Sequence, residues 1–364
     1  MSDLMFFNLP TKMYHEHNCV SAHADELCSL GTKALIITGQ SSSKKNGSLE
    51  DVTAALDGHK IAYAIFDKIE ENPSVETVIA AAIFGISEKA DFVIGIGGGS
   101  PLDASKAVAL LIANGVFDKD FLYTTNKNAP HLPVAAVPTT CGTGSEVTGV
   151  SVLTLHEDHT KKSIAHQIFP DIALVDSKYL KTAPKSVLIS TALDALAHLC
   201  ESYLHVKADA YSHMSAEKGL SVWGGVKQAL LDGEFSDDTL DKLMAASVMA
   251  GISIRLTGTS LPHGLSYRVT YECKMVHGKA CAVFLPAFID NAPDEYKHRI
   301  LELLGFERFS DLKRFVETLC ADCEIPQDIL ELSIADMLKN KTKLASACYP
   351  IDENMLRKIT EDYC

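Results

Sequence analysis

The first half of the chain alternates between short apolar runs and segments with helical spacing. Glycine, proline or polar clusters separate the two kinds of segment. Because strands that alternate with helices pair in parallel, this order predicts a mostly parallel sheet with helices on both faces. The expected strands are residues 33–39, 61–67, 91–96, 133–137, 150–155 and 172–176, and the expected helices are 74–89 and 102–114.

The pattern changes near Ala183-Pro184, after which long helical patterns follow one another with few β-branched runs. A chain of 364 residues is also long enough for two domains. We therefore predict an α/β domain over residues 1–184 and an all-helical domain over residues 185–364. The helices of the second domain are expected at 190–206, 209–231, 238–257, 279–290, 309–322 and 353–362.

Charge and composition exclude several classes of partner. The formal net charge is −14 and the chain has no basic run, which argues against nucleic acid and anionic membranes. No apolar stretch reaches the length of roughly 18 residues that a membrane span needs, and the first residues do not resemble a signal peptide. The ten cysteines have no framework spacing, so we expect a reduced, cytoplasmic protein.

One carboxylate and three histidines form a candidate metal site. Asp194 and His198 are four residues apart in a helical segment, so their side chains share one face. His263 and His277 are each followed by a glycine, where we expect the backbone to bend sharply. One carboxylate and three imidazoles suit Fe(II) or Zn(II) and leave one coordination position of the metal for the substrate. A lone histidine is more often a hydrogen-bonded core residue than a metal ligand. The prediction of a metal site therefore depends on the motifs that precede these residues in the chain.

Two glycine-containing loops precede the candidate metal site. Residues 97–101 (GGGSP) join an expected strand to an expected helix, and residues 138–146 (PTTCGTGSE) follow the next strand. Backbone N–H groups that side chains do not cover can bind a pyrophosphate at a helix N-terminus. The first loop lacks the G-x-G-x-x-G fingerprint, so a tight turn without a ligand is the alternative.

These motifs together are similar to those of the iron-containing (group III) alcohol dehydrogenase family, in its NADP-type, butanol dehydrogenase-like branch. The resemblance is carried by GGGSPLDASK, PTTCGTGSEVT, DALAHLCESY, Glu71-Asn72-Pro73 and the two His-Gly sites. It implies a Rossmann-like dinucleotide-binding α/β domain and a helical metal-binding domain, an architecture like that of dehydroquinate synthase. It also implies a homodimer, with the metal and the nicotinamide meeting in the cleft between the domains.

The resemblance also implies roles for individual residues. Asp194, His198, His263 and His277 match the family's metal ligands. Positions that match its cofactor contacts are Asn72, Gly97, Gly98, Gly99, Ser100, Asp103, Thr139, Thr140, Thr143, Ser145 and Lys162, although Lys162 would equally suit a solvated turn.

This chain departs from the family at two positions. Tyr267 stands where many members have a further histidine that serves proton transfer, so it either takes over that role or simply lines the pocket. Cys141 replaces a common alanine near the cofactor, where the thiol is either oxidation-sensitive or a small buried neighbour.

The end of the first expected strand bears on the choice of cofactor. NAD enzymes place an acidic residue at the end of a strand in this domain, where it bonds the ribose 2′-hydroxyl. In this chain no carboxylate stands at that strand end, and hydroxyl and ammonium groups that suit a 2′-phosphate follow it. We therefore predict NADP(H) rather than NAD(H), which stays possible, with contacts from Gly39, Ser41, Ser42, Ser43 and Lys44.

The predicted function is that of a metal-dependent alcohol dehydrogenase or aldehyde reductase, which transfers a hydride between NADP(H) and a short-chain alcohol or aldehyde. Fe(II) is expected from the resemblance, and Zn(II) fits the ligands equally well. One alternative is an NAD- and zinc-dependent polyol dehydrogenase of the glycerol type. The others are a lyase of the dehydroquinate synthase kind, for which the site region has few basic residues, and a nucleotide-binding scaffold without activity.

Overall fold

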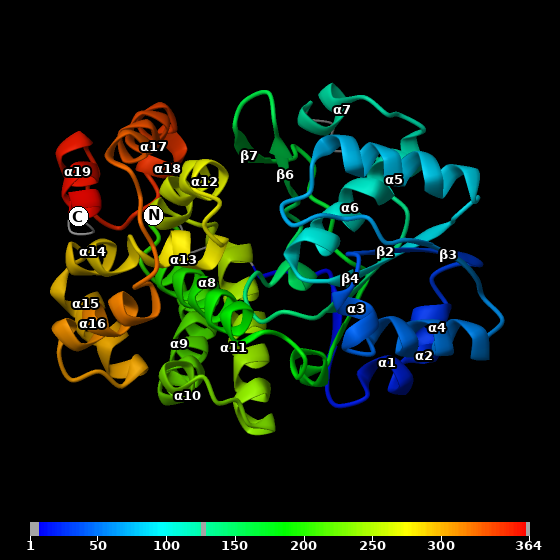
Figure 1. Ribbon diagram of the computed structural model, residues 1–364, viewed down its shortest axis with the longest axis horizontal. Coiled ribbons are helices and arrows are strands. Elements are labelled where there is room, and N and C mark those ends of the chain that lie inside the picture. The colour runs from blue at the N-terminus through cyan, green and yellow to red at the C-terminus, as the bar shows by residue number, and fades with distance from the viewer. Residues whose placement is uncertain (1–6, 125–128, 362–364) are drawn as a thin grey trace. The chain divides into compact units, whose positions relative to one another are not determined.

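The computed structural model describes residues 7–124 and 129–361 (Figure 1). By the packing of its backbone, the chain divides into two compact units. The α/β unit comprises Leu9–Thr140 and Ser145–Pro184, and the helical unit contains the chain from Lys185 onward together with Cys141–Gly144. The short segment Cys141–Gly144 therefore packs with helices that follow it by more than forty residues of sequence.

The α/β unit is built on one six-stranded sheet in the order β1-β8-β5-β4-β2-β3. Every pairing in this sheet is parallel, which confirms the predicted sheet type. The edge strand β1 has only partly buried or exposed side chains, so its sequence lacks the apolar run that marks the inner strands. The strands are β1 Lys12–His15, β2 Lys33–Thr38, β3 Ala62–Phe66, β4 Phe92–Gly97, β5 Val134–Pro138 and β8 Ile172–Val175.

Helices cover both faces of this sheet (Figure 1). Side chains along a strand alternate between faces, so Leu35 and Ile37 join one apolar core while Ala34 and Ile36 join the other. The first core includes residues of α5 and α6, and the second includes residues of α1, α2 and α4. The helices are α1 Cys19–Ala22, α2 Ala24–Cys28, α3 Ser42–Lys45, α4 Ser48–Gly58, α5 Val75–Ser87, α6 Gly99–Asn114 and α7 Lys119–Tyr123.

One expected strand lies outside the parallel sheet. Strand β6 (Val152–Leu155) pairs antiparallel with β7 (Thr160–Ser163) in a separate two-stranded hairpin. The hairpin forms because a short turn joins the two segments, which leaves no room for the crossover that parallel pairing requires. Two 3-10 turns, Ser145–Val147 and Ser177–Leu180, complete this part of the chain.

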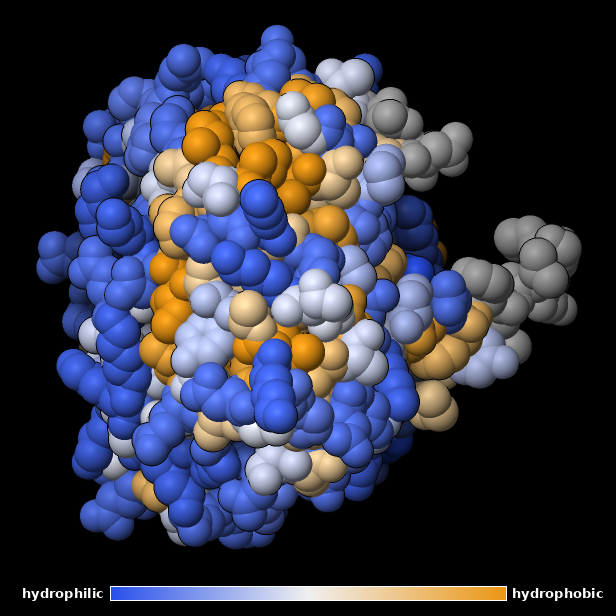
Figure 2. Space-filling model, turned by 90° about the vertical axis from the view of Figure 1, so that its right-hand side faces the viewer, coloured by the Kyte–Doolittle hydropathy of each residue, from blue (hydrophilic) through white to orange (hydrophobic). Residues whose placement is uncertain are grey.

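On the side of the molecule where β3 and α5 lie, hydrophobic side chains reach the surface (Figure 2). Ile65 on β3 is 37% exposed, and Ile83 and Ile86 on α5 are 51% and 40% exposed. Strand β3 is also an edge of the sheet, so its outer backbone groups have no neighbouring strand within the sheet.

Every element described from Lys185 onward is helical, which confirms the predicted class of this half. The expected helix 209–231 is divided at Gly224-Gly225, because glycine disfavours a helix interior. The expected helix 279–290 is divided before Pro286, because proline lacks the backbone N–H that a helix interior needs. Residue 362, the expected end of the last helix, lies outside the described residues. The helices are α8 Lys185–Tyr203, α9 Ala210–Gly224, α10 Lys227–Asp232, α11 Asp237–Thr257, α12 Leu261–Glu272, α13 His277–Ala282, α14 Leu285–Asp290, α15 Asp294–Leu304, α16 Phe309–Leu319, α17 Gln327–Lys339, α18 Lys341–Leu344 and α19 Glu353–Glu361.

Helix α8 is the central helix of this unit. All residues from Ala192 to Tyr203 are buried, and α9, α11 and α13 pack against the helix. Gly219 on α9 allows close packing, because a Cβ atom there would lie 2.4 Å from Leu199. The indole of Trp223 donates a hydrogen bond of 2.7 Å to the Ala192 carbonyl oxygen. Within the described residues, none of the helices combines the length and the apolar character that crossing a membrane requires.

Candidate metal centre

Helix α8 contributes a carboxylate and an imidazole to one buried cluster. Asp194 and His198 are 3% and 5% exposed, and the distance from Asp194 Oδ1 to His198 Nε2 is 4.0 Å. The two side chains lie one turn apart on the same helix face, as their spacing predicts. This is the carboxylate–imidazole pair from which the metal site was expected.

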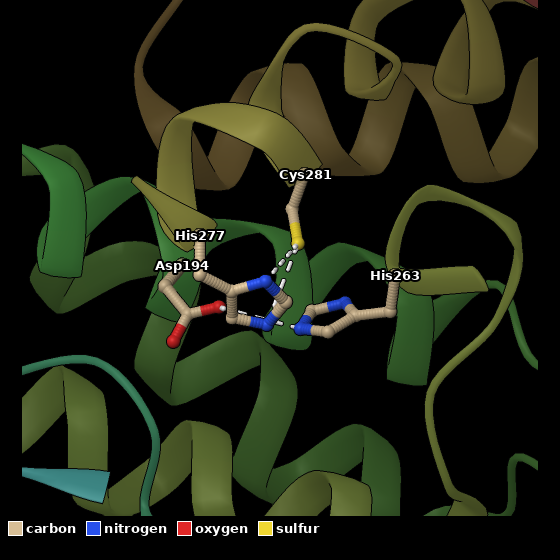
Figure 3. A group of neighbouring side chains, drawn as sticks. All are labelled: Asp194, His263, His277 and Cys281. Carbon is tan, nitrogen blue, oxygen red and sulfur yellow. Dashed lines mark hydrogen bonds and ion pairs between the residues drawn. The ribbon is translucent and has the colours of Figure 1, made fainter. Parts of the chain in front are cut away.

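Two further imidazoles reach the same carboxylate from other helices (Figure 3). His263 lies in the first turn of α12, and its Nε2 is 3.3 Å from Asp194 Oδ1. His277 is the first residue of α13, and its Nε2 is 4.0 Å from the same oxygen. The ring of His198 stacks on that of His263 with centroids 4.2 Å apart. The structure therefore brings together all four residues that the sequence singled out as ligands.

Two atoms of this cluster are buried without a hydrogen-bond partner. They are Asp194 Oδ1 and His263 Nε2, which face each other across 3.3 Å. Burying unpaired polar atoms costs roughly 1–3 kcal/mol each, so the fold stabilises them poorly by itself. In tetrahedral coordination at about 2.0–2.3 Å from a metal, donor atoms stand roughly 3.3–3.7 Å apart. The residues present thus fit a divalent metal ion.

The electrostatics of the cluster favour a positive charge at its centre. Burial lowers the pKa of His198 to about 4, so this imidazole is neutral at neutral pH, as a ligand must be. Burial opposes ionisation of Asp194, but the imidazoles of His198, His263 and His277 outweigh it and lower the pKa of this carboxyl. Burial also acts to lower the pKa of His263, yet Cys281, Glu201 and Asp194 outweigh burial and raise it. A cation at His263 is therefore stabilised, whether it is a proton or a metal ion.

A cysteine that the sequence analysis did not select belongs to the same cluster. Cys281 lies on α13 one turn after His277, and its Sγ is 3.9 Å from His277 Nε2. The ligand atoms of Asp194, His263, His277 and Cys281 all lie within 4.8 Å of one another. The spacing of four residues between His277 and Cys281 repeats that of Asp194 and His198, so it predicts that the two side chains share a helix face, but not that this face meets Asp194.

Glu201 fixes the orientation of His263 and was also missed. Its Oε1 accepts hydrogen bonds from His263 Nδ1 at 2.6 Å and from the His263 backbone N–H at 3.1 Å. The Ser260 backbone N–H donates to the other carboxylate oxygen. With its Nδ1 proton held by a carboxylate, His263 turns its Nε2 toward Asp194, where this nitrogen can bind a proton or a metal ion. Glu201 lies three residues after His198, on the ligand-bearing helix.

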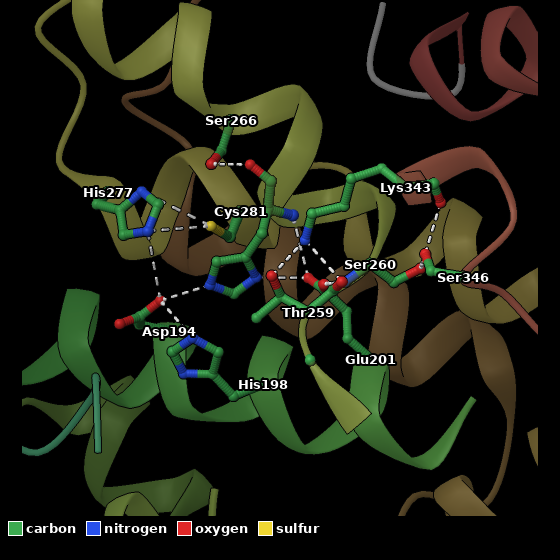
Figure 4. A network of polar contacts seen from close by, with 12 residues as sticks. Asp194, His198, Glu201, Thr259, Ser260, Ser266, His277, Cys281, Lys343 and Ser346 are labelled. Carbon is green, nitrogen blue, oxygen red and sulfur yellow. Dashed lines mark hydrogen bonds and ion pairs between the residues drawn. The ribbon is translucent and has the colours of Figure 1, made fainter. Parts of the chain in front are cut away.

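A partly buried lysine stands behind Glu201 (Figure 4). The Lys343 ammonium donates to the Thr259 carbonyl oxygen at 2.6 Å and contacts the Thr259 hydroxyl. Burial lowers the pKa of Lys343 to about 8, although the negative charge of Glu201 acts against the shift. Glu201 is thus itself held in place by charge and by hydrogen bonds from the segment before α12.

The glycines after His263 and His277 do not provide the expected sharp bends, because both lie inside helices. Their role is close packing. A Cβ atom on Gly278 would stand 1.8 Å from the Ser190 carbonyl oxygen of α8, and one on Gly264 would stand 2.0 Å from the end of the Met337 side chain. The absence of a side chain at position 278 therefore lets α13 approach α8 closely enough for His277 to reach Asp194.

Tyr267 lies next to the cluster, one turn after His263 on α12. Its ring stacks on that of His277, with centroids 6.2 Å apart and an angle of 21° between the ring planes. Burial raises the pKa of Tyr267 to about 12, so the phenol keeps its proton at neutral pH. In this state the side chain can donate a hydrogen bond beside the candidate metal site.

In the α/β unit the two predicted phosphate loops lie side by side. The Thr139 backbone N–H donates to the Gly97 carbonyl oxygen at 2.8 Å. Gly97 has φ +150°, and a Cβ there would stand 2.6 Å from Pro101, so only glycine fits this turn. A Cβ on Gly98 would stand 3.0 Å from the side chain of Thr140. Helix α6 begins at Gly99, three residues earlier than expected, and so Ser100 lies in its first turn, where backbone N–H groups favour anions.

Asp103 and Ser145 are hydrogen-bonded within the protein. Ser145 donates to Asp103 Oδ1 at 2.5 Å, and the Val152 backbone N–H donates to Asp103 Oδ2 at 2.8 Å. The fully buried Lys106 ammonium, which the sequence analysis did not select, donates to Ser145 at 2.7 Å and pairs with Asp103. These three side chains join α6 to the loop that contains Ser145.

Asn72 lies where the glycine loop and the β6–β7 hairpin meet. It has φ +58°, its backbone N–H donates to the Ser100 hydroxyl at 3.0 Å, and its side chain accepts a bond of 2.7 Å from Lys161. Lys162, the lysine expected to reach the nucleotide, is exposed instead, with its ammonium 5.0 Å from the Tyr123 ring centroid. The lysine beside Asn72 is therefore Lys161, because adjacent strand residues point to opposite faces.

Thr143 and Cys141 belong to the segment that packs with the helical unit, unlike the other residues of the second loop. Cys141 is buried, with its Sγ 3.3 Å from the Thr191 hydroxyl, and burial raises the pKa of its thiol to about 11. The Gly142 carbonyl oxygen lies 3.2 Å from His198 Nδ1, so this segment helps to orient a predicted ligand.

Three of the expected NADP-binding residues, Ser42, Ser43 and Lys44, lie in the short helix α3 rather than in an open loop, and Gly39 and Ser41 precede this helix. Gly39, Ser41 and Ser42 are partly or fully exposed. Ser43 is buried, and its hydroxyl accepts a hydrogen bond of 2.8 Å from the Thr38 hydroxyl. Lys44 pairs with Asp67 at 2.6 Å. No carboxylate follows β2 directly in the sequence, but the structure brings Asp67 to this strand end, because β2 and β3 are neighbouring parallel strands that end at the same edge.

Comparison with known proteins agrees with these observations. Residues 10–177 match the iron-containing alcohol dehydrogenase family, and residues 188–358 match the C-terminal domain of the same family. The chain therefore belongs to the iron-containing alcohol dehydrogenase family, as its motifs indicate, and is an oxidoreductase that acts on alcohols or aldehydes.

Individual relatives cover nearly the whole chain. The crystal structure of an iron-containing alcohol dehydrogenase from Thermotoga maritima is 33% identical with a TM-score of 0.91, and the match covers 99% of each chain. Long-chain-alcohol dehydrogenase 1 of Geobacillus thermodenitrificans is 29% identical, covering 92% of this chain and 91% of that protein. NADPH-dependent butanol dehydrogenase of Clostridium saccharobutylicum is 27% identical, covering 94% of this chain and 91% of that protein.

Proposed function

We propose that this protein is a metal-dependent alcohol dehydrogenase or aldehyde reductase that transfers a hydride between NADP(H) and a short-chain alcohol or aldehyde. The observation that carries the proposal is the cluster of Asp194, His198, His263 and His277, in which two buried donor atoms lack hydrogen-bond partners. Its membership of the iron-containing family supports Fe(II) as the ion, and Zn(II) is the alternative.

Each residue of the cluster has a defined task in this proposal. When bound, a divalent ion supplies Lewis-acid chemistry at the substrate oxygen, and a nicotinamide supplies or accepts the hydride. Asp194 contributes the negative charge, while Glu201 orients His263. His277 is the most exposed of the four, with 26% of its side chain accessible, so the substrate approaches from its side. Tyr267 stacks on His277 and lines the same side as a protonated phenol.

In the α/β unit, the proposal assigns the pyrophosphate to backbone N–H groups at Gly98, Gly99 and Ser100. Lys161 takes the place of Lys162 as the lysine linked to this loop, because it donates to Asn72, whose backbone N–H bonds the Ser100 hydroxyl. Thr139 and Thr140 pack against the glycine loop, and Asp103, Ser145 and Lys106 join α6 to the second loop. The likeness to an NADPH-dependent butanol dehydrogenase supports NADP(H), as do the exposed Ser41 and Ser42 hydroxyls beside Gly39.

The ion pair between Lys44 and Asp67 favours NAD(H) as a second candidate, because this carboxylate would repel a 2′-phosphate. The deciding experiment is an assay of NADPH and NADH oxidation with butyraldehyde, on protein loaded anaerobically with Fe(II). Faster turnover with NADPH, well above a metal-free control, is expected. Faster turnover with NADH would overturn the cofactor assignment but keep the dehydrogenase.

Substitution of Lys44 tests the cofactor contact itself. We expect Lys44→Ala to raise the KM for NADPH by roughly 10-fold and to leave the KM for NADH unchanged, because only NADPH carries the 2′-phosphate. Lys45→Ala is the companion variant, since Lys45 lies next to Lys44 on the same short helix, is also exposed and is the alternative source of positive charge; an effect confined to Lys45→Ala would move the contact to that residue. An equal change with both cofactors would refute the assignment.

The same assay separates the rival functions. Turnover of glycerol with NAD and Zn(II), but not of butyraldehyde, would identify a polyol dehydrogenase. Bound metal without turnover of either would favour a lyase of the dehydroquinate synthase kind, and protein that holds no metal would favour a scaffold.

Three further proposals concern the whole chain. A division into domains at residues 184 and 185 is supported by the compact units, and limited proteolysis tests it. A homodimer is supported by the exposed Ile65, Ile83 and Ile86, and light scattering measures its mass. Residence in the cytoplasm is supported by the nine cysteines of the described residues, all of which are free thiols.

A further inference from the structure

Cys281 has the position of a metal ligand rather than that of a simple core residue. It is 0% exposed, and its Sγ lies 3.8 Å and 3.9 Å from the two ring nitrogens of His277. Figure 3 shows the sulfur pointing toward the space among the imidazoles of His263 and His277 and the carboxylate of Asp194. A buried cysteine usually packs as a small hydrophobe, but this one faces two buried polar atoms that lack hydrogen-bond partners.

We propose that the Cys281 sulfur is a further ligand of the metal ion held by Asp194, His263 and His277. The proposal rests on the proposed metal-dependent function, and it changes the site from an oxygen–nitrogen set to one that includes a thiolate. The four donor atoms lie within 4.8 Å of one another, a spread that small side-chain rotations can close to the distances of a bound ion.

The arrangement on α13 lets the thiol bind without closing the site to substrate. His277 and Cys281 lie one turn apart on this helix, so both face the ion. The His277 side chain is 26% exposed and Cys281 is fully buried, so the sulfur occupies the closed side of the cluster. His198 would remain a further donor to the same ion, and the exposed side of the cluster at His277 would stay open to the substrate.

Binding of the thiol has a simple chemical balance. The sulfur–hydrogen bond is lost as the sulfur–metal bond forms, and the proton passes to solvent. Neither sulfur nor metal changes its oxidation state. Because thiolate is a soft ligand, its presence raises the affinity for Zn(II) and Co(II) relative to hard ions such as Mg(II) and Mn(II).

The test is the absorption spectrum of the full-length protein loaded anaerobically with Co(II). Sulfur bound to Co(II) gives an intense charge-transfer band in the near ultraviolet, which oxygen and nitrogen ligands do not give. We expect this band in the wild type at one Co(II) per chain, and we expect its loss in Cys281→Ser and Cys281→Ala with Co(II) still bound. Cys200→Ser is the matched control and retains the band, because Cys200 is equally buried on α8 but lies outside the cluster.

The outcomes separate this inference from the proposed function. One bound Co(II) without the band, or a band that persists in both Cys281 variants, overturns the sulfur ligand and leaves the metal site intact. Wild-type protein that binds no Co(II) overturns both. If the variants do not fold, X-ray absorption of the Zn(II)-loaded wild type decides the matter, since a sulfur neighbour at about 2.3 Å supports the proposal and a shell of only oxygen and nitrogen refutes it.

Discussion

The metal centre and the nucleotide loops treat their buried polar atoms in opposite ways. In the helical unit, Asp194 Oδ1 and His263 Nε2 are buried with no hydrogen-bond partner. In the α/β unit, the side chains around the glycine loop bond one another, as the contacts of Asp103 with Ser145 and of Asn72 with Lys161 show. The first region has side-chain atoms that a bound cation would satisfy, whereas in the second the side chains bond one another.

This difference separates two ways of building a binding site. A metal site needs several side-chain donors pointed at one place, which leaves them unsatisfied until the ion binds. A phosphate loop binds through backbone N–H groups, so its side chains are free to satisfy one another. We therefore expect the residues of the candidate metal site to act as ligands, and Asp103, Ser145 and Lys106 to act by keeping the loop that contains Ser145 in place.

The largest effect is expected where a ligand is removed. Asp194→Ala should abolish turnover and bring bound metal below one ion per chain, because the site loses its carboxylate. NADPH binding should stay within about twofold of wild type, since the loops lie in the other unit. Metal analysis and calorimetric titration with NADPH measure the two effects. Asp238→Ala, an exposed carboxylate on α11, is the control, and full activity in Asp194→Ala would contradict the metal site.

Glu201 tests whether the helical site depends on residues behind the ligands. Glu201→Gln should weaken metal binding by roughly 10–100-fold, because the neutral amide holds the Nδ1 proton of His263 less strongly. Competition with a chelator measures the affinity, and Glu217→Gln on α9 is a partly exposed control. A variant with a lower melting temperature but unchanged metal affinity would show that Glu201 only stabilises the fold.

The smallest effect is expected in the α/β unit, where a side chain acts through the loop. Lys161→Met should weaken NADPH binding by about 10-fold, because Asn72 loses the partner that holds it beside Ser100. Lys162→Met is the matched control and should bind NADPH as the wild type does, since Lys162 is exposed. Fluorescence titration compares the two variants. A larger loss in Lys162→Met would return the role to the residue that the sequence favoured.

Periodicity in the sequence was enough to predict much of the fold. The alternation of apolar runs and helical patterns predicted the parallel sheet, since a buried strand and an amphipathic helix each leave a local pattern. Strand β1 was missed because an edge strand leaves no such pattern, and β6 was placed wrongly because its partner β7 consists of polar residues. A pattern shows that a segment forms a strand, but not which strand it pairs with.

By itself, the sequence determined which side chains share one element: Asp194 with His198 on a helix, and the glycines of the first phosphate loop at a strand end. Local spacing decides this, because helix and strand geometry repeat regularly. Only the tertiary structure decided that Cys281 joins the metal cluster and that Asp67 meets Lys44. Those contacts join helices or strands that are distant in the sequence, so they depend on how the elements pack against one another. Gly278 is an example, because its lack of a side chain lets α13 approach α8.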